Sequence, residues 1–205
     1  MKRLFFLIVI LVSGIAVQAQ KTISADNYQT KDNDDEVQTI MNSFELKRIR
    51  GFGGPTLSFS SIGDEFALFT GGGGGLIINN FFIGGYGEGL SANSHQNDLT
   101  KIHDIEFGHG GFWLGYEFMP QKMVHPVFSV RSGWGRIKGV QDNVSYSDNV
   151  FVLKPTIAAE VNFTRFMKVN VGADYRHVFN AELGDMTSND FSDIGVYVSF
   201  IFGWF

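Results

Sequence analysis

The sequence predicts an all-β fold: an antiparallel, up-and-down transmembrane β-barrel of about eight strands, preceded by a signal peptide and a short polar segment. Three observations lead to this prediction. From residue 49 to the end, apolar residues alternate with polar or small ones. Turn residues interrupt this alternation at regular spacing, and aromatic residues gather beside the shorter connections. Such a pattern is typical of strands that carry one apolar and one polar face.

The chain begins with the three parts of a signal peptide. Lys2 and Arg3 form a basic start, an apolar run extends to Val17, and Ala19 lies at the expected cleavage site. The run is short for a helix that crosses about 30 Å of hydrocarbon, so a retained anchor is the weaker alternative. The predicted division of the chain is a signal peptide at residues 1–19, a polar periplasmic lead-in at 20–48 and the transmembrane barrel at 49–205.

Composition excludes several kinds of function. Without Lys2 and Arg3, 14 of the 16 Lys and Arg residues remain against 21 Asp and Glu, so the mature net charge is −7, which argues against nucleic acid as a partner. The chain has no Cys. Thiol nucleophiles, zinc–thiolate sites, disulfides and lipid attachment through a cysteine are therefore excluded. The 25 Gly and 21 Phe residues fit a pleated sheet better than a helical domain.

Residues 49–205 divide into eight strands and their connections. The strands are expected at 49–62, 65–78, 81–92, 103–118, 124–138, 149–162, 166–180 and 191–205. After the first connection, short turns alternate with longer loops, which are Asn93–Ile102, Gly139–Asp148 and Ala181–Asp190. An even number of strands joined in this way brings both chain ends to one side, which is the periplasm in an outer-membrane barrel.

The sixth expected strand displays the two faces most clearly. Phe151, Leu153 and Ile157 share one face, while Lys154 and Glu160 share the other. A soluble barrel around an apolar ligand would turn the apolar face inward, so alternation alone leaves both orientations open. The membrane barrel is favoured because small residues separate the charges, as a narrow lumen requires, and because aromatic residues collect at membrane interfaces.

The end of the chain resembles the C-terminal signal of outer-membrane barrels, which ends in an aromatic residue and is read by the barrel-assembly machinery. The segment runs from Val196 to Phe205, and the signal positions are Tyr197, Ile201 and Phe205. Together with Gly53-Gly54-Pro55 and Gly84-Gly85-Tyr86-Gly87, it resembles small, mostly uncharacterised outer-membrane barrels of Bacteroidetes-type bacteria. The resemblance implies a barrel and no particular activity.

One detail departs from that signal. The more apolar frame of the segment contains Val196 and Trp204 rather than Phe205. Either a bulge shifts the register near the end, or Phe205 lies on the inner frame or beyond the barrel rim.

Charged residues on the polar faces form the candidate site. They are Glu88, Glu117, Arg131, Lys154, Glu160, Asp174 and Arg176. Isolated charges are costly in a narrow, water-poor lumen, so these residues are expected to pair and to plug the barrel. Because strands are expected to place them on neighbouring inner faces, Glu160 is predicted to be a partner of Lys154 or Arg176.

No catalytic, cofactor or metal site is predicted. The run Gly71–Gly75 lacks the Lys-Ser or Lys-Thr and the helix of a phosphate loop. His103 and His109 would share a face but lie ~20 Å apart along an extended strand. Some eight-stranded outer-membrane barrels are lipid A deacylases with His and Ser two residues apart on a late strand; after His177 that position holds Phe179, which cannot act as a nucleophile.

The leading hypothesis is a non-enzymatic outer-membrane barrel of a Gram-negative bacterium with a structural or surface-recognition role. Recognition would be carried by the three longer loops, since loops vary on a rigid scaffold. The expected partners are outer-membrane lipid, the barrel-assembly machinery and an unknown surface ligand. Two alternatives remain: a lipid-modifying outer-membrane enzyme like the lipid A deacylases, and a soluble exported barrel that binds an apolar ligand.

Overall fold

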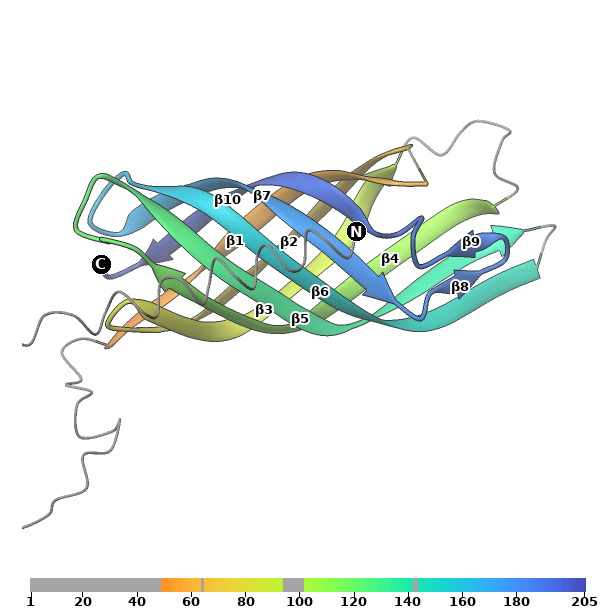
Figure 1. The fold of residues 1–205 in the computed structure, drawn as a ribbon, viewed down its shortest axis with the longest axis horizontal. Coiled ribbons are helices and arrows are strands. Elements are labelled where there is room, and N and C mark those ends of the chain that lie inside the picture. The colour runs from red at the N-terminus through yellow and green to blue at the C-terminus, as the bar shows by residue number, and fades with distance from the viewer. Residues whose placement is uncertain (1–48, 64, 94–101, 142–143) are drawn as a thin grey trace, which may run out of the picture. The chain divides into compact units, whose positions relative to one another are not determined.

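The computed structural model describes residues 49–205 except for 64, 94–101 and 142–143 (Figure 1). The predicted signal peptide and the polar lead-in lie outside the described residues. Within those residues, no helix has the length and apolar character needed to cross a membrane.

Eight strands form a closed antiparallel barrel in the order β1-β10-β7-β6-β5-β4-β3-β2. This confirms the predicted fold class. The barrel strands are β1 (Ile49–Ile62), β2 (Glu65–Ile78), β3 (Phe81–Asn93), β4 (Ile102–Glu117), β5 (Val124–Gln141), β6 (Val144–Asn162), β7 (Met167–Phe179) and β10 (Asp193–Gly203). A small separate hairpin consists of β8 (Glu182–Leu183) and β9 (Met186–Thr187).

The two ends of the barrel differ. One end, called the turn end, has the short connections after β2, β4 and β6, together with the start of β1 and the last residue of the chain. At the β2–β3 connection, Asn79 has a φ of 59°, a left-handed conformation that asparagine tolerates. The opposite end, called the loop end, has the connections after β1, β3, β5 and β7. Figure 1 shows β8 and β9 at the loop end.

The prediction of one of the three long loops is wrong. The sequence predicts a loop at Gly139–Asp148, but β5 extends to Gln141 and β6 begins at Val144, and these two residues pair. Both faces of this extension are mostly polar or small, so no apolar alternation marks it, while backbone pairing continues beyond the apolar band. The expected loop Ala181–Asp190 contains the β8–β9 hairpin.

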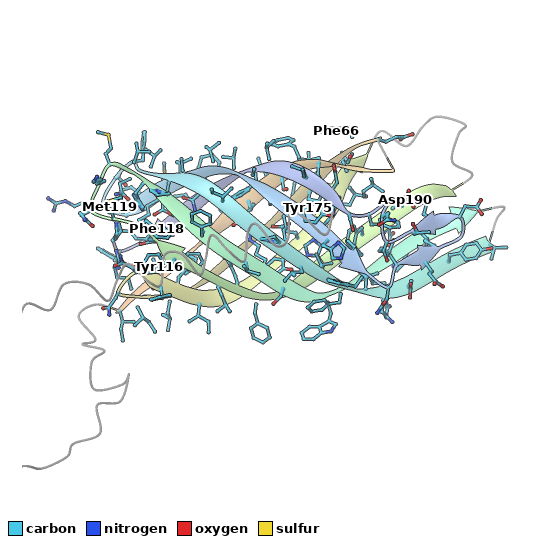
Figure 2. All side chains as sticks on the ribbon, viewed as in Figure 1. Phe66, Tyr116, Phe118, Met119, Tyr175 and Asp190 are labelled. Atoms are coloured by element: carbon cyan, nitrogen blue, oxygen red, sulfur yellow. The ribbon has the colours of Figure 1, made fainter. Side chains whose placement is uncertain are left out.

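The barrel wall is apolar outside, and its interior contains buried charged side chains as well as two apolar clusters. Phe112, Ile157 and Val171 point outward and are 59%, 50% and 53% exposed. Arg131 and Lys154 point inward and are only 1% and 0% exposed. A soluble barrel has the reverse arrangement, whereas a barrel surrounded by lipid has this one. Figure 2 shows side chains projecting from the outer surface along the barrel wall.

Glycines on the inner face make room for large side chains. A Cβ at Gly73 would lie 2.6 Å from the carbonyl oxygen of Gly85 and 3.1 Å from Cε3 of Trp113. The Trp113 ring also packs edge-on against Phe52 and Phe82. The glycine-rich segment of β2 therefore shapes the lumen.

Candidate functional site in the barrel interior

The first interior cluster consists of four charged side chains from four strands. Glu88 on β3 accepts a hydrogen bond from Nη1 of Arg131 on β5. Its other oxygen lies 2.7 Å from Nζ of Lys154 on β6. The same ammonium lies 3.3 Å from Oδ2 of Asp174 on β7. Ser58 on β1 joins them, because its hydroxyl accepts from Lys154 at 3.2 Å and donates to Asp174 at 3.3 Å. These contacts tie opposite walls of the barrel together.

Aromatic rings surround Arg131 in this cluster. The guanidinium carbon lies 4.5 Å from the ring centre of Trp113, 5.4 Å from Tyr197 and 5.8 Å from Tyr86. Tyr86 also contacts Nδ1 of His109 through its hydroxyl, at 3.2 Å. A planar cation between ring faces is stabilised by cation–π attraction, which is stronger where water is excluded.

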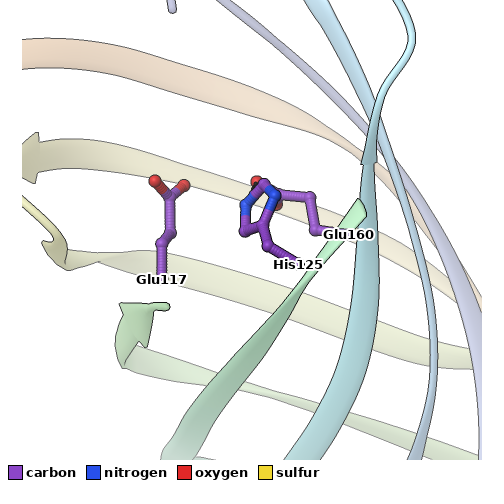
Figure 3. Close-up of side chains that lie close together, drawn as sticks. All are labelled: Glu117, His125 and Glu160. Carbon is purple, nitrogen blue, oxygen red and sulfur yellow. Dashed lines mark hydrogen bonds and ion pairs between the residues drawn. The ribbon is translucent and has the colours of Figure 1, made fainter. Parts of the chain in front are cut away.

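The second interior cluster lies nearer the turn end. Nζ of Lys168 lies 2.9 Å from Oε1 of Glu117 and 2.6 Å from Oε1 of Glu160. Nε2 of His125 lies 3.0 Å from the same Glu160 oxygen. Arg50 reaches the other oxygen of Glu117 at 3.7 Å. Figure 3 shows the side chains of Glu117, His125 and Glu160 facing one another.

This second cluster contains the donor types of a metal site. One ligand atom from each of Glu117, His125 and Glu160 lies within 4.8 Å of the others. However, the ammonium of Lys168 already bridges both carboxylates, and Arg50 supplies a second positive charge. A divalent cation would have to displace Lys168 into a buried environment without its partners, which is costly. The arrangement is that of an ion-pair network.

The structure thus places all seven candidate charges inside the barrel, although not with all of the expected partners. Glu160 was predicted to pair with Lys154 or Arg176, and this is wrong. Its partners are Lys168 and His125, because those residues lie at the same level of the neighbouring strands near the turn end. The predicted charge network omitted Lys168 and His125, although the alternation puts both on the polar faces of their strands.

Arg176 stands apart from both clusters, near the loop end. Its Nε donates to the carbonyl of Phe191 at 2.8 Å and its Nη2 to the carbonyl of Ser61 at 2.7 Å, while Nη1 donates to Oγ of Ser60 at 2.8 Å. Its guanidinium carbon lies 4.3 Å from the ring centre of Phe69. Arg176 therefore fastens the segment before β10 to β1.

Apolar side chains fill the loop end of the lumen. Leu183 and Phe191 are both 0% exposed and belong to one buried cluster with Phe69, Val152 and Val178. The first two come from the segment between β7 and β10, and the other three come from barrel strands. The β8–β9 hairpin thus packs its apolar side chains into the loop end of the barrel.

The deacylase arrangement, which the sequence left as an alternative, does not form in the described part of the chain. His177 stacks against Tyr175 at 6.0 Å and meets Phe179 edge-on at 4.3 Å. The serine hydroxyls nearby have other partners: Ser188 accepts from the backbone of Ala181 and Ser192 from that of Val178. No hydroxyl nucleophile is hydrogen-bonded to His177 among the residues of the described barrel.

The C-terminal positions lie on the inner frame of β10. Tyr197 and Ile201 are 3% and 6% exposed, whereas Trp204 is 86% exposed. The ring centre of Phe205 lies 4.3 Å from Nζ of Lys168. Of the alternatives left open by the sequence, the structure therefore has Phe205 on the inner frame.

Comparisons with known proteins show the fold. No family model matches the sequence, and neither does any curated protein sequence. Neisserial surface protein A is similar in structure with a TM-score of 0.57 and 12% identity, covering 77% of this chain and 97% of that chain. Ail, the attachment invasion locus protein of Yersinia pestis, has a TM-score of 0.45 and 13% identity over 76% and 96%. A major outer membrane protein from Thermus thermophilus has a TM-score of 0.44 and 12% identity over 75% and 99%. The first of these comparisons supports the fold described above, a closed eight-stranded antiparallel β-barrel.

Proposed function

We propose that this chain is a non-enzymatic outer-membrane β-barrel of a Gram-negative bacterium, with a plugged lumen and a structural or surface-recognition role. The observation that carries the proposal is the polarity of the wall. Apolar side chains are exposed outside and paired charges are buried inside, which is the reverse of a soluble barrel. An apolar belt of this kind is stable in lipid and unfavourable in water. Outer-membrane lipid is thus the first partner, and the barrel-assembly machinery that reads the chain end is the second.

Three layers of side chains support a plugged lumen. The Glu117–Lys168–Glu160 cluster crosses the lumen at the inner end of a cavity of about 720 Å³ that opens at the turn end. The Glu88–Arg131–Lys154–Asp174 cluster crosses the middle, and the β8–β9 hairpin packs into the loop end. Barrels of eight strands have interiors that side chains can fill. A transport role through the lumen is therefore disfavoured, and recognition falls to the loop end. The candidate surfaces there are the paired extension of β5 and β6 and the β8–β9 hairpin.

The proposed orientation puts the turn end and both chain ends in the periplasm, with the loop end outside the cell. Because the chain has no Cys, single cysteines can report this directly. Ser145→Cys lies on the extension at the loop end and Gln121→Cys on a turn, and both positions are exposed. A membrane-impermeant maleimide should label Ser145→Cys on intact cells and Gln121→Cys only after permeabilisation. The opposite labelling would reject the orientation, and recovery of both in the soluble periplasm would reject the membrane barrel.

The enzymatic alternative has no support from the geometry. His177 lies among aromatic rings, and the position two residues later holds Phe179. Release of fatty acid from purified lipopolysaccharide by the folded protein would overturn the non-enzymatic proposal.

A further inference from the structure

Two neighbouring turns at the turn end each present a cation beside an apolar side chain. The turn between β4 and β5 contains Lys122 and Met123, and the turn between β6 and β7 contains Arg165 and Phe166. All four side chains are exposed. Figure 2 shows Met119, which belongs to the first of these turns, at the same end of the barrel. Exposed cations beside exposed apolar side chains are typical of segments that lie at a membrane surface.

Asn162, the last residue of β6, holds the two turns side by side. Its side-chain nitrogen Nδ2 donates to the carbonyl oxygen of Lys122 at 2.7 Å, and its backbone nitrogen donates to that of Met123 at 2.9 Å. The second turn is closed by hydrogen bonds from two of its backbone nitrogens to the carbonyl oxygen of Met167. The two cations are therefore carried by turns whose backbones are fixed relative to each other.

These turns carry positive charge without acidic residues of their own. Residues 118–123 and 163–166 include no Asp or Glu. The acidic residues nearest to them in the sequence are Glu117 and Glu160, which are buried in the lumen, where Lys168 contacts both. The β8–β9 hairpin at the loop end has the opposite charge, with Glu182 and Asp185 exposed. A basic surface beside a membrane attracts anionic lipid head groups.

An apolar hollow of about 390 Å³ adjoins these turns on the outer wall of the barrel. Val124 begins β5 two residues after Lys122, and Ala159 on β6 lies three residues before Asn162. Pro126 and Ala159 pair across the two strands, and their short side chains leave the depression. The exposed side chains that line it are Val124, Pro126, Ile157, Ala159 and Val171. All of them are apolar, so the hollow can hold a hydrocarbon chain.

We infer that this region binds one anionic phospholipid of the outer membrane. Its phosphate contacts Lys122 and Arg165, and one of its acyl chains lies in the hollow beside Val124 and Ala159. The guanidinium of Arg165 can donate two parallel hydrogen bonds to phosphate oxygens, and the net negative charge of the lipid complements the two cations. A lipid fits better than a soluble phosphate, because the cations adjoin an apolar surface. The inference rests on the proposed function, since it requires a barrel that lies in lipid.

The test compares dioleoyl phosphatidylglycerol with dioleoyl phosphatidylcholine, which has the same chains but no net charge. Protein folded in neutral detergent is titrated with each lipid and analysed by native mass spectrometry, and heat-modified gel mobility confirms that every variant is folded. The double variant Lys122→Gln/Arg165→Gln removes the proposed head-group contacts. Its matched control is Arg136→Gln/Lys138→Gln, which removes two exposed cations at the loop end. Ala159→Trp fills the hollow from the lipid-facing side.

In the unaltered protein, one phosphatidylglycerol should bind at least about tenfold more tightly than phosphatidylcholine. Lys122→Gln/Arg165→Gln should reduce this preference to less than about threefold, and Arg136→Gln/Lys138→Gln should leave it unchanged. Ala159→Trp should weaken binding of both lipids by a similar factor, because their chains are the same; if it does not fold, the two double variants decide. Glycerol 3-phosphate, which has the phosphate without acyl chains, should not displace phosphatidylglycerol.

Equal affinity for the two lipids in the unaltered protein, or an equal loss of preference in the two double variants, would overturn the inference. So would unchanged lipid affinity in folded Ala159→Trp, or displacement of phosphatidylglycerol by glycerol 3-phosphate, which would indicate a site for a soluble anion. Each of these results leaves the proposed function intact if the protein folds into bilayers of phosphatidylcholine alone. Recovery of the protein in the soluble periplasm would reject both.

Discussion

Lys154→Met should destabilise the folded barrel strongly, because it removes the cation that joins two buried carboxylates. Nζ of Lys154 lies 2.7 Å from Glu88 and 3.3 Å from Asp174. At an effective dielectric constant of about 20, the first contact alone corresponds to an attraction of about 6 kcal/mol, part of which is offset by desolvation. Breaking a buried pair from one side typically costs about 3 to 5 kcal/mol, and that is the expected loss in the free energy of unfolding.

The control for Lys154→Met is Lys138→Met. Its ammonium lies at a similar distance from a carboxylate, 2.9 Å from Glu106, but the two side chains are 53% and 70% exposed. The expected loss there is at most about 1 kcal/mol. Urea unfolding of protein in lipid vesicles, followed by gel mobility, measures both. Losses of equal size for the two variants would refute the argument that the inner cluster is shielded from water. Asp174→Asn added to Lys154→Met should recover part of the loss, because it removes one of the carboxylates left without its cation.

The remaining predictions concern lipid contact, the second cluster and the lumen. Val171→Arg puts a guanidinium on the apolar outer face and should cost about 2 to 4 kcal/mol near the membrane midplane, whereas Ser145→Arg on the extension should cost almost nothing; the same unfolding assay compares them. Glu160→Gln should weaken folding, and Lys168→Met should then cost less in that variant than in the unaltered protein, which a double-mutant cycle measures. Planar bilayer recordings should detect no large, stable single-channel current, and such currents would mean that the lumen is open.

Strand positions were predictable because lipid and lumen impose opposite demands on alternate residues. The ranges expected for β1 and β2 agree with the structure, and the inner and outer faces of β6 follow from the alternation. The alternation of apolar and polar residues is lost where a strand contacts neither lipid nor the lumen. The paired extension, Gly139–Gln141 of β5 with Val144–Tyr146 of β6, lies beyond the apolar band. Only backbone hydrogen bonds define it, and its side chains show no alternation that would predict a strand.

The ion-pair partners of side chains in the lumen were harder to predict than the strand faces on which those side chains lie. Alternation assigns Glu160 to the inside, but its partner depends on the stagger between strands, which sets which residues lie at the same level. The stagger brings Lys168 and His125 to Glu160 and takes Lys154 to Glu88 on the far wall. The register shifts in the β2–β3 and β4–β5 pairings were also beyond the sequence, because no residue pattern marks them.

The first interior cluster, Glu88, Arg131, Lys154 and Asp174, favours a barrel that closes as it enters the membrane. With Ser58, the first interior cluster draws side chains from β1, β3, β5, β6 and β7, and the contact between Ser58 and Asp174 joins residues 116 positions apart. In a sheet that had entered the bilayer without curling shut, Lys154 and Asp174 could still pair across neighbouring strands, but Glu88 on β3 would lie away from Lys154, which is one of its two compensating cations. Such an intermediate is penalised twice, by desolvation of its charges and by the entropy of closing a long loop. Closure and insertion should therefore occur together, and spontaneous refolding should be slow, in keeping with a topology dominated by distant contacts.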